Sequence, residues 1–139
     1  MSIEINYEAV LLATLSSMVV GAIWYMPQLF GKSWMKITKV DPSKTPGSPL
    51  KIYGLTLLAS FLTAYVLAHT TYIANQVIGS SYMSSAVSTA FWLWLGFIVS
   101  RLLVHDLFEQ RPTKLTMLNA GHEFATVMVM ALIIGGFGV

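Results

Sequence analysis

The chain has 139 residues, of which 55% are hydrophobic and 10% charged, and its mean hydropathy is +0.68. A soluble domain carries about 25% charged residues, so this composition argues against a soluble protein and indicates a single compact unit in a membrane. The absence of cysteine excludes disulfides, thiol catalysis and thiolate metal sites.

Four apolar stretches are long enough to cross a bilayer, which takes about 20 helical residues. They lie near 8–27, 51–74, 83–108 and 115–138. The first is not a signal peptide, because Glu4 and Glu8 stand where a positive region is needed and no small-x-small cleavage site follows. The sequence therefore predicts an all-α membrane protein, an antiparallel four-helix transmembrane bundle that forms one domain over 1–139.

The segment after the first helix is basic and amphipathic. Pro27 ends the helix, and the segment 28–39 then carries apolar and basic positions on different faces. We expect either a short helix in the membrane interface or an irregular basic loop with one anchoring tryptophan. The expected interface residues are Phe30, Lys32, Trp34 and Lys36. A linker over 38–50 follows, with three prolines that disfavour helix.

The basic residues predict the orientation of the helices. All eight lysines and arginines lie in or beside the first and third loops, namely Lys32, Lys36, Lys39, Lys44, Lys51, Arg101, Arg111 and Lys114. Basic residues accumulate on the cytoplasmic side, so both loops are expected in the cytoplasm and both termini outside it. The net charge of +2 is therefore explained by the orientation of the helices and does not indicate binding to nucleic acid. The expected partner is the lipid bilayer of the inner (plasma) membrane.

Small residues recur at four-residue spacing along the first helix, at Ala9, Ala13, Ser17 and Gly21. Such rows let helix backbones approach closely in a membrane. We interpret Ala13, Ser17 and Gly21 mainly as helix-packing residues within the chain, with a subunit interface as the alternative. Because four short helices enclose little volume, a homo-oligomer or a place in a larger membrane complex is expected.

Two sequence blocks resemble a known family. The first is GAIWYMPQLFGKSWM at 21–35, with the pattern Gly-x-x-Trp-Tyr followed by Phe-Gly-Lys-x-Trp, and the second is LFEQRPTKLTMLNAGHEF at 107–124. Together they are similar to the bacterial membrane family named domain-of-unknown-function family 1761, over nearly the whole chain. The resemblance implies the four-helix layout and a bacterial membrane. The family carries no established activity, so function has to be inferred from the residues.

Ionisable and polar residues gather on both sides of a turn centred on Pro112. In an antiparallel hairpin, Arg101 lies at the level of Glu123 and His105 at that of Asn119. The candidates for a polar pocket are Arg101, His105, Asp106, Glu109, Asn119, His122 and Glu123. Charges inside a membrane are costly, so such residues usually have a partner and often a function. We expect an ion pair between Arg101 and Glu123.

Two interpretations of this cluster remain open. The ion pair could simply fix the register of two helices, or the cluster could line a cytoplasmic-side pocket in which His105 and His122 carry protons. The second interpretation predicts binding or transport of a proton, ion or small polar solute; the alternative is an accessory subunit in a larger complex. A metal site is disfavoured because no HExxH or paired ExxH motif is present, and no cofactor is expected. An enzyme is the weaker expectation, because no complete catalytic set is visible.

Overall fold

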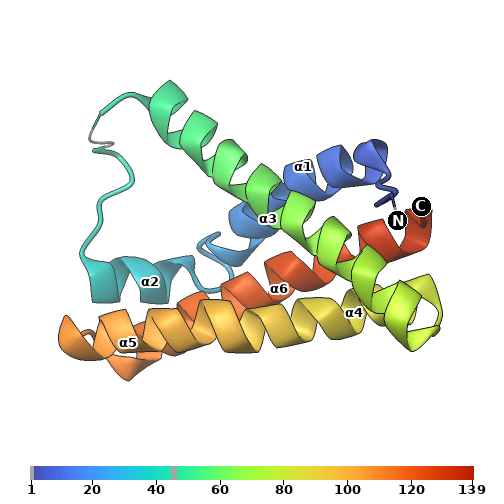
Figure 1. Cartoon of the computed structure of the whole chain (residues 1–139). Coiled ribbons are helices and arrows are strands. Elements are labelled where there is room, and N and C mark those ends of the chain that lie inside the picture. The colour runs from blue at the N-terminus through green and yellow to red at the C-terminus, as the bar shows by residue number, and fades with distance from the viewer. Residues whose placement is uncertain (1, 45–46) are drawn as a thin grey trace.

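The computed structural model describes residues 2–44 and 47–139, which form helices and short connections with no strand in either range. The helical segments, labelled in Figure 1, are α1 (Tyr7–Trp24), α2 (Gly31–Thr38), α3 (Pro49–Ile78), α4 (Tyr82–Leu93), the π-helical segment η1 (Trp94–Val99), α5 (Ser100–Phe108) and α6 (Thr113–Phe137). α4, η1 and α5 follow one another without a break and make one helix, Tyr82–Phe108. The all-helical class is confirmed.

Four helices are long and apolar enough to cross a membrane. They are Tyr7–Trp24, Pro49–Ile78, Tyr82–Phe108 and Thr113–Phe137, close to the four expected ranges. α2 is a shorter, fifth helix, so the basic segment after α1 is helical and not an irregular loop. The expected linker 38–50 runs from the end of α2 into the first turn of α3, and its residues 45–46 lie outside the described residues.

A tight turn follows α1. Pro27 cannot donate a helical hydrogen bond, and α1 ends before it, at Trp24. The N–H of Gly31 closes the turn by donating to the carbonyl of Met26 at 3.1 Å. A β-carbon at Gly31 would collide with the carbonyl oxygen of Tyr25, so this close approach of two backbone segments requires glycine.

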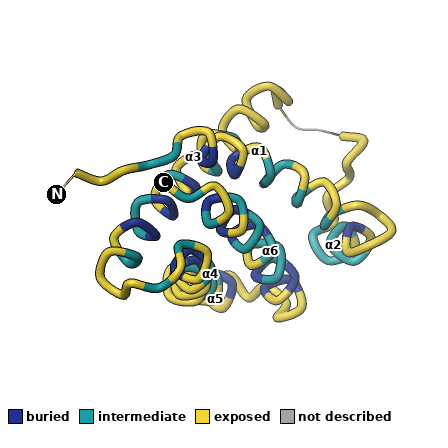
Figure 2. Tube along the Cα trace, turned by 90° about the vertical axis from the view of Figure 1, so that its right-hand side faces the viewer, coloured by how far each residue is buried: buried dark blue, intermediate teal, exposed yellow. Residues whose placement is uncertain are grey.

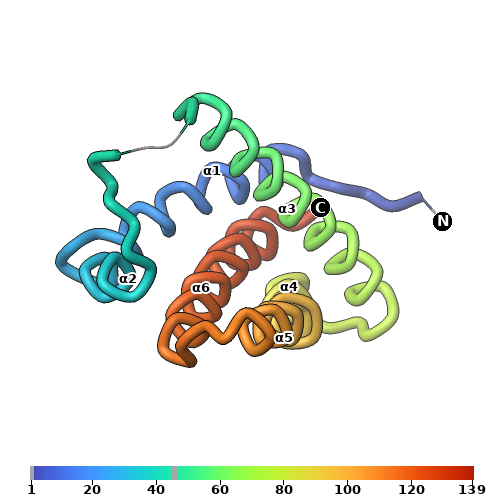
Figure 3. Tube along the Cα trace, turned by 90° about the vertical axis from the view of Figure 1, so that its left-hand side faces the viewer, coloured from blue at the N-terminus to red at the C-terminus, as the bar shows by residue number. Residues whose placement is uncertain are grey.

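α6 is the central helix of the fold. It packs against α1 on one side and α4 on the other, and α3 packs against α1 and α4 (Figure 3). In Figure 2 the buried residues run along α6, while the outer faces of the other helices are exposed. The core that results is built from small and medium side chains: Ala9, Val10, Ala13, Ala64, Leu67, Ala68, Ala86, Ala90, Val127, Met130, Ala131 and Ile134. Small residues let the helix backbones approach closely.

The two ends of this arrangement differ. The end near the chain termini contains the alanine-rich core, and we call it the closed end (Figure 1). At the other end, which we call the open end, α3 diverges from its neighbours, and every residue from Pro49 to Thr56 is exposed. α2 and the turn after α5 also lie at the open end (Figure 1). Cavities are therefore expected beneath the first half of α3.

The helix Tyr82–Phe108 departs from the regular helix expected over 83–108. Its segment Trp94–Val99 is π-helical, a form that is rare and found mostly as short interruptions of α-helices. A π-turn holds more residues than an α-turn. Residues before and after this segment therefore do not share the helix faces that a 3.6-residue period predicts. Trp94 points from this segment toward α6, and its Nε1–H donates to the carbonyl of Ala120 at 2.9 Å.

Candidate functional site

A cavity of about 640 Å³ lies between α1, α3 and α6 at the open end, and we call it the polar cavity. Its lining combines hydroxyl groups, two tyrosines and one histidine–glutamate pair with small and apolar residues: Ser17, Met18, Gly21, Ala22, Tyr25, Tyr53, Thr56, Ala59, Ser60, Thr63, His122, Glu123, Thr126 and Met130. The three helices that form it are all long and apolar enough to cross a membrane. A polar cavity among such helices is the feature that most needs a functional explanation.

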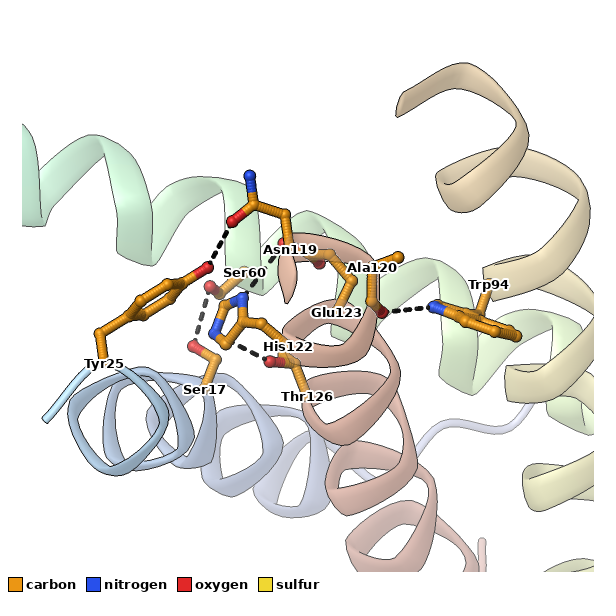
Figure 4. A network of polar contacts seen from close by, with 9 residues as sticks. All are labelled: Ser17, Tyr25, Ser60, Trp94, Asn119, Ala120, His122, Glu123 and Thr126. Carbon is orange, nitrogen blue, oxygen red and sulfur yellow. Dashed lines mark hydrogen bonds and ion pairs between the residues drawn. The ribbon is translucent and has the colours of Figure 1, made fainter. Parts of the chain in front are cut away.

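The ionisable groups of the polar cavity come from α6. Nδ1 of His122 lies 3.5 Å from Oε1 of Glu123, and Nε2 of His122 lies 3.4 Å from the hydroxyl of Thr126 (Figure 4). The His122 side chain is 18% exposed and that of Glu123 is 41% exposed, so the imidazole is the more enclosed partner. The carboxylate of Glu123 therefore stays accessible to a bound solute, with the imidazole beside it.

Tyr25 joins the turn after α1 to α6. Its hydroxyl donates to Oδ1 of Asn119 at 2.9 Å, and its ring centroid lies 4.9 Å from that of His122 (Figure 4). Trp34 of α2 meets the Tyr25 ring edge-on, with centroids 5.4 Å apart. Burial, and after it the carboxylate of Glu123, raises the pKa of Tyr25 to about 12, so the phenol keeps its proton and remains a donor to Asn119.

Hydroxyl groups connect α1 and α3 across the cavity. The Ser17 hydroxyl donates to that of Ser60 at 2.8 Å, and this bond links the two helices directly (Figure 4). Thr56, Ser60 and Thr63 follow the four- and three-residue spacing of one helix face, and all three line the cavity. α3 thus presents a row of hydroxyl groups to the histidine and carboxylate of α6.

Two glycines lie where α1 and α6 approach each other, and the approach is tight only at Gly121. A β-carbon at Gly121 would lie 3.0 Å from Cζ2 of Trp24, so a larger residue would push the indole ring away. A β-carbon at Gly21 would come within 3.6 Å of Nε2 of His122. Gly21 and Trp24 belong to the block 21–35, and Gly121 and His122 to the block 107–124. The two blocks therefore meet at the edge of the polar cavity.

The predicted polar cluster separates into different parts of the molecule. Glu123 and His122 line the cavity, and Asn119 contacts it through Tyr25. Asp106 is buried elsewhere, where it accepts a hydrogen bond of 2.7 Å from the Thr116 hydroxyl. The remaining candidates, Arg101, His105 and Glu109, are exposed.

The expected ion pair between Arg101 and Glu123 is wrong. Over residues 2–44 and 47–139, the ion pairs are those of Glu123 with His122 and of Glu109 with Arg111, the latter at 2.7 Å. Arg101 and His105 are four residues apart on one face of α5, and both are exposed, whereas Asp106 on another face is buried. The structure therefore leaves Arg101 on an exposed face of α5 and Glu123 in the polar cavity.

The packing and interface candidates occupy distinct positions. Ala13 and Ser17 are buried, and Gly21 is partly buried beside His122. In and before α2, Phe30, Lys32 and Lys36 are exposed, while Trp34 is half-buried against Tyr25. In the described part of the chain, no group of three or more His, Cys, Asp or Glu residues could hold a metal ion.

The sequence did not single out Tyr25, Ser60 or Tyr53 as site residues. Ser17 and Ser60 are 43 positions apart, and no local pattern predicts their contact. The hydroxyl row at Thr56, Ser60 and Thr63 was a usable signal, because three hydroxyl groups at helical spacing stand out in an apolar helix.

An all-helical fold with four span-length apolar helices in its described residues, three of which enclose a polar cavity, defines the class of this protein. The chain belongs to the family described as protein of unknown function (DUF1761), whose model matches residues 8–135. This confirms the family that the sequence blocks 21–35 and 107–124 indicated. No curated protein and no solved structure matches the chain.

Proposed function

We propose that the chain is a multi-pass protein of the bacterial inner membrane that binds a small polar solute, ion or proton in the polar cavity. The four span-length helices cross the bilayer as an antiparallel bundle, and the open end faces the cytoplasm. The protein acts as a binding or transport protein and not as an enzyme. The observation that carries the proposal is the His122–Glu123 pair inside a cavity of about 640 Å³ among helices of membrane-spanning length.

The outer surface supports a position in lipid. Large apolar side chains are exposed along the outer faces of the helices, for example Leu11, Leu15, Val19 and Ile23 of α1, all more than half exposed. A soluble protein rarely leaves so continuous an apolar surface in water. A bilayer covers this surface, and Phe30 and Lys32 at the start of α2 suit the boundary between its hydrocarbon and the headgroups.

The distribution of charge supports the orientation. The lysines and arginines lie in α2, in the connections at the open end and in the helical turns near them, whereas the termini lie at the opposite end (Figure 1). By the positive-inside rule, the open end faces the cytoplasm and both termini face outward. Solutes therefore reach the polar cavity from the cytoplasmic side.

Single cysteines test this orientation in a chain that has none of its own. We expect Ser2→Cys to react with a membrane-impermeant maleimide in intact spheroplasts, and Lys36→Cys to react only after the membrane is permeabilised. Both side chains are exposed, so poor access within the protein does not confound the comparison. The reverse labelling pattern would overturn the orientation.

A pair of glutamate substitutions tests binding. In protein reconstituted into nanodiscs, Glu123→Gln should weaken binding of the solute at least tenfold, because it removes the carboxylate that lines the cavity. Glu109→Gln makes the same chemical change at an exposed residue outside the cavity and should leave binding unchanged. The measurement is calorimetric titration with a panel of inorganic ions, neutral polar solutes and organic ions. Equal loss in both variants, or no binding of any probe, would contradict the proposal.

The alternative of an accessory subunit rested partly on the small-residue row of α1. Ala9 and Ala13 are at most 1% exposed, and Ser17 bonds to Ser60 of α3. This row is occupied within the chain, so it offers no surface to another subunit. Solute binding is therefore the function that we put forward.

A further inference from the structure

A second cavity lies on the other side of α3. It measures about 480 Å³, lies between α3, the helix Tyr82–Phe108 and α6, and is lined by Leu62, Val66, Phe97 and Val127 among others. Thr63 of α3 lines both this apolar cavity and the polar cavity. On α6, Thr126 faces the polar cavity while its neighbour Val127 faces the apolar one. The two cavities are therefore neighbours on either side of Thr63.

The polar cavity has a negative bias. Glu123 is the only carboxylate among the described residues that line it, and those residues include no lysine or arginine. The other polar groups are hydroxyls, the phenols of two tyrosines and the His122 imidazole. Aromatic rings and a carboxylate are the groups that hold organic cations in proteins, whereas an anionic group would meet Glu123 with only the His122 imidazole, in its protonated form, to balance it.

The apolar cavity is suited to a hydrocarbon group. Apart from the shared Thr63, every residue that lines it is apolar, and it offers no charged partner. Its volume lies within the range of pockets that hold drug-sized ligands. Burial of an alkyl chain from water favours binding by about fourfold for each methylene group.

We infer that the solute is an amphipathic organic cation with an ammonium head at Glu123 and a single apolar tail that passes Thr63 into the apolar cavity. This inference rests on the proposed function and names the class of its solute. It also explains why an apolar cavity adjoins the polar one at Thr63, beneath the middle of α3, where it can receive the tail.

Four probes, three of which have the same six-carbon chain, test the inference in phosphatidylcholine nanodiscs, with empty nanodiscs subtracted. Hexylammonium should bind, hexanoate should not, and hexanol should bind at least tenfold more weakly than hexylammonium. Methylammonium, which lacks the tail, should also bind at least tenfold more weakly. These four comparisons use the unaltered chain, so they do not depend on whether a variant folds.

Two variants locate the head and the tail. Glu123→Gln should reduce hexylammonium binding to the level of hexanol. Val66→Phe fills the apolar cavity and should reduce hexylammonium binding to the level of methylammonium, while methylammonium binding stays unchanged. Val77→Phe is the matched control, because Val77 is 81% exposed on the same helix and lies outside both cavities.

The outcomes separate this inference from the function on which it rests. Equal binding of hexylammonium and hexanoate, or no effect of either variant, overturns the amphipathic cation. If a neutral polar solute or an inorganic ion binds instead and depends on Glu123, the proposed function stands and the inference fails. If no probe binds in either experiment, both fail.

Discussion

The closed and open ends of the molecule are built from the same four long helices but differ in what fills the space between them. At the closed end, alanines such as Ala13 and Ala64 are fully buried, and the helices pack directly on one another. At the open end, α3 diverges, and the polar cavity lies beneath it. The apolar cavity adjoins the polar one at the middle of α3, where the core residues Leu67, Ala90 and Val127 also line it. Close packing at one end therefore holds the helices while the other end remains available for a ligand.

This difference separates stability from binding. Interactions that hold the fold come chiefly from close packing, and a well-packed core is sensitive to single changes of volume. Side chains around a cavity have room to adjust, so changes there affect binding more than stability. The comparison predicts that a substitution at the closed end will chiefly lower the unfolding free energy. A similar substitution at the open end will chiefly weaken binding.

The largest effect is expected from Ala64→Leu. Ala64 is 0% exposed in the core of the closed end, so a leucine there forces helices apart at a cost of about 3 kcal/mol of unfolding free energy. Ala59→Leu introduces the same side chain five residues earlier on α3, where the residue is exposed and lines the polar cavity. Its unfolding free energy should remain within about 0.5 kcal/mol of the parent chain.

Unfolding in mixed micelles with increasing dodecyl sulfate measures both variants. Ala59→Leu should also weaken solute binding, because the leucine occupies part of the polar cavity. If Ala59→Leu destabilised the protein as much as Ala64→Leu, the two ends would not differ in packing as the structure indicates.

A smaller effect is expected from Gly121→Ala. The added β-carbon would lie 3.0 Å from Cζ2 and 3.1 Å from Cη2 of Trp24, so the indole ring has to move. We expect a loss of about 1 kcal/mol and a shift in tryptophan fluorescence. Gly96→Ala is the control, since its β-carbon would meet nothing within 4 Å. An unchanged fluorescence spectrum in Gly121→Ala would show that Trp24 does not rest on this glycine.

The fold class was predictable from the sequence because hydrophobic length is a strong local signal. Each of the four span-length helices was expected within a few residues of its observed bounds. The sequence also showed that the basic segment after α1 would have separate apolar and basic faces if helical. Whether it forms a helix or a loop depends on contacts such as that of Trp34 with Tyr25. Local pattern thus predicted the elements and left their contacts open.

The site was less predictable, because depth along a hairpin does not determine which face a residue occupies. Arg101 and Glu123 were expected to pair on depth alone, yet Arg101 is exposed on the outer face of α5. The π-helical segment Trp94–Val99 changes which residues share a face along this helix, and no pattern in the sequence predicts it. His122 and Glu123 were candidates for a polar pocket from the sequence, but the residues of α1 and α3 that surround them depend on long-range packing.

The smallest effect is expected at the exposed turn between α5 and α6. A hydrogen bond from Arg111 and, after it, the charge of Arg111 lower the pKa of Glu109 below its ordinary value. A carboxyl group whose pKa is lowered on folding contributes stability above its unfolded pKa and loses it as the pH falls through the folded pKa.

Arg111→Gln should therefore raise the titration midpoint of Glu109 toward the ordinary value, as measured by carbon NMR of labelled glutamate. Because both side chains are about half exposed, added salt should reduce the difference between parent and variant, and unfolding should change little at neutral pH. A midpoint that stays low without Arg111 would show that another group holds the carboxylate, and that this turn is more enclosed than the open end as a whole.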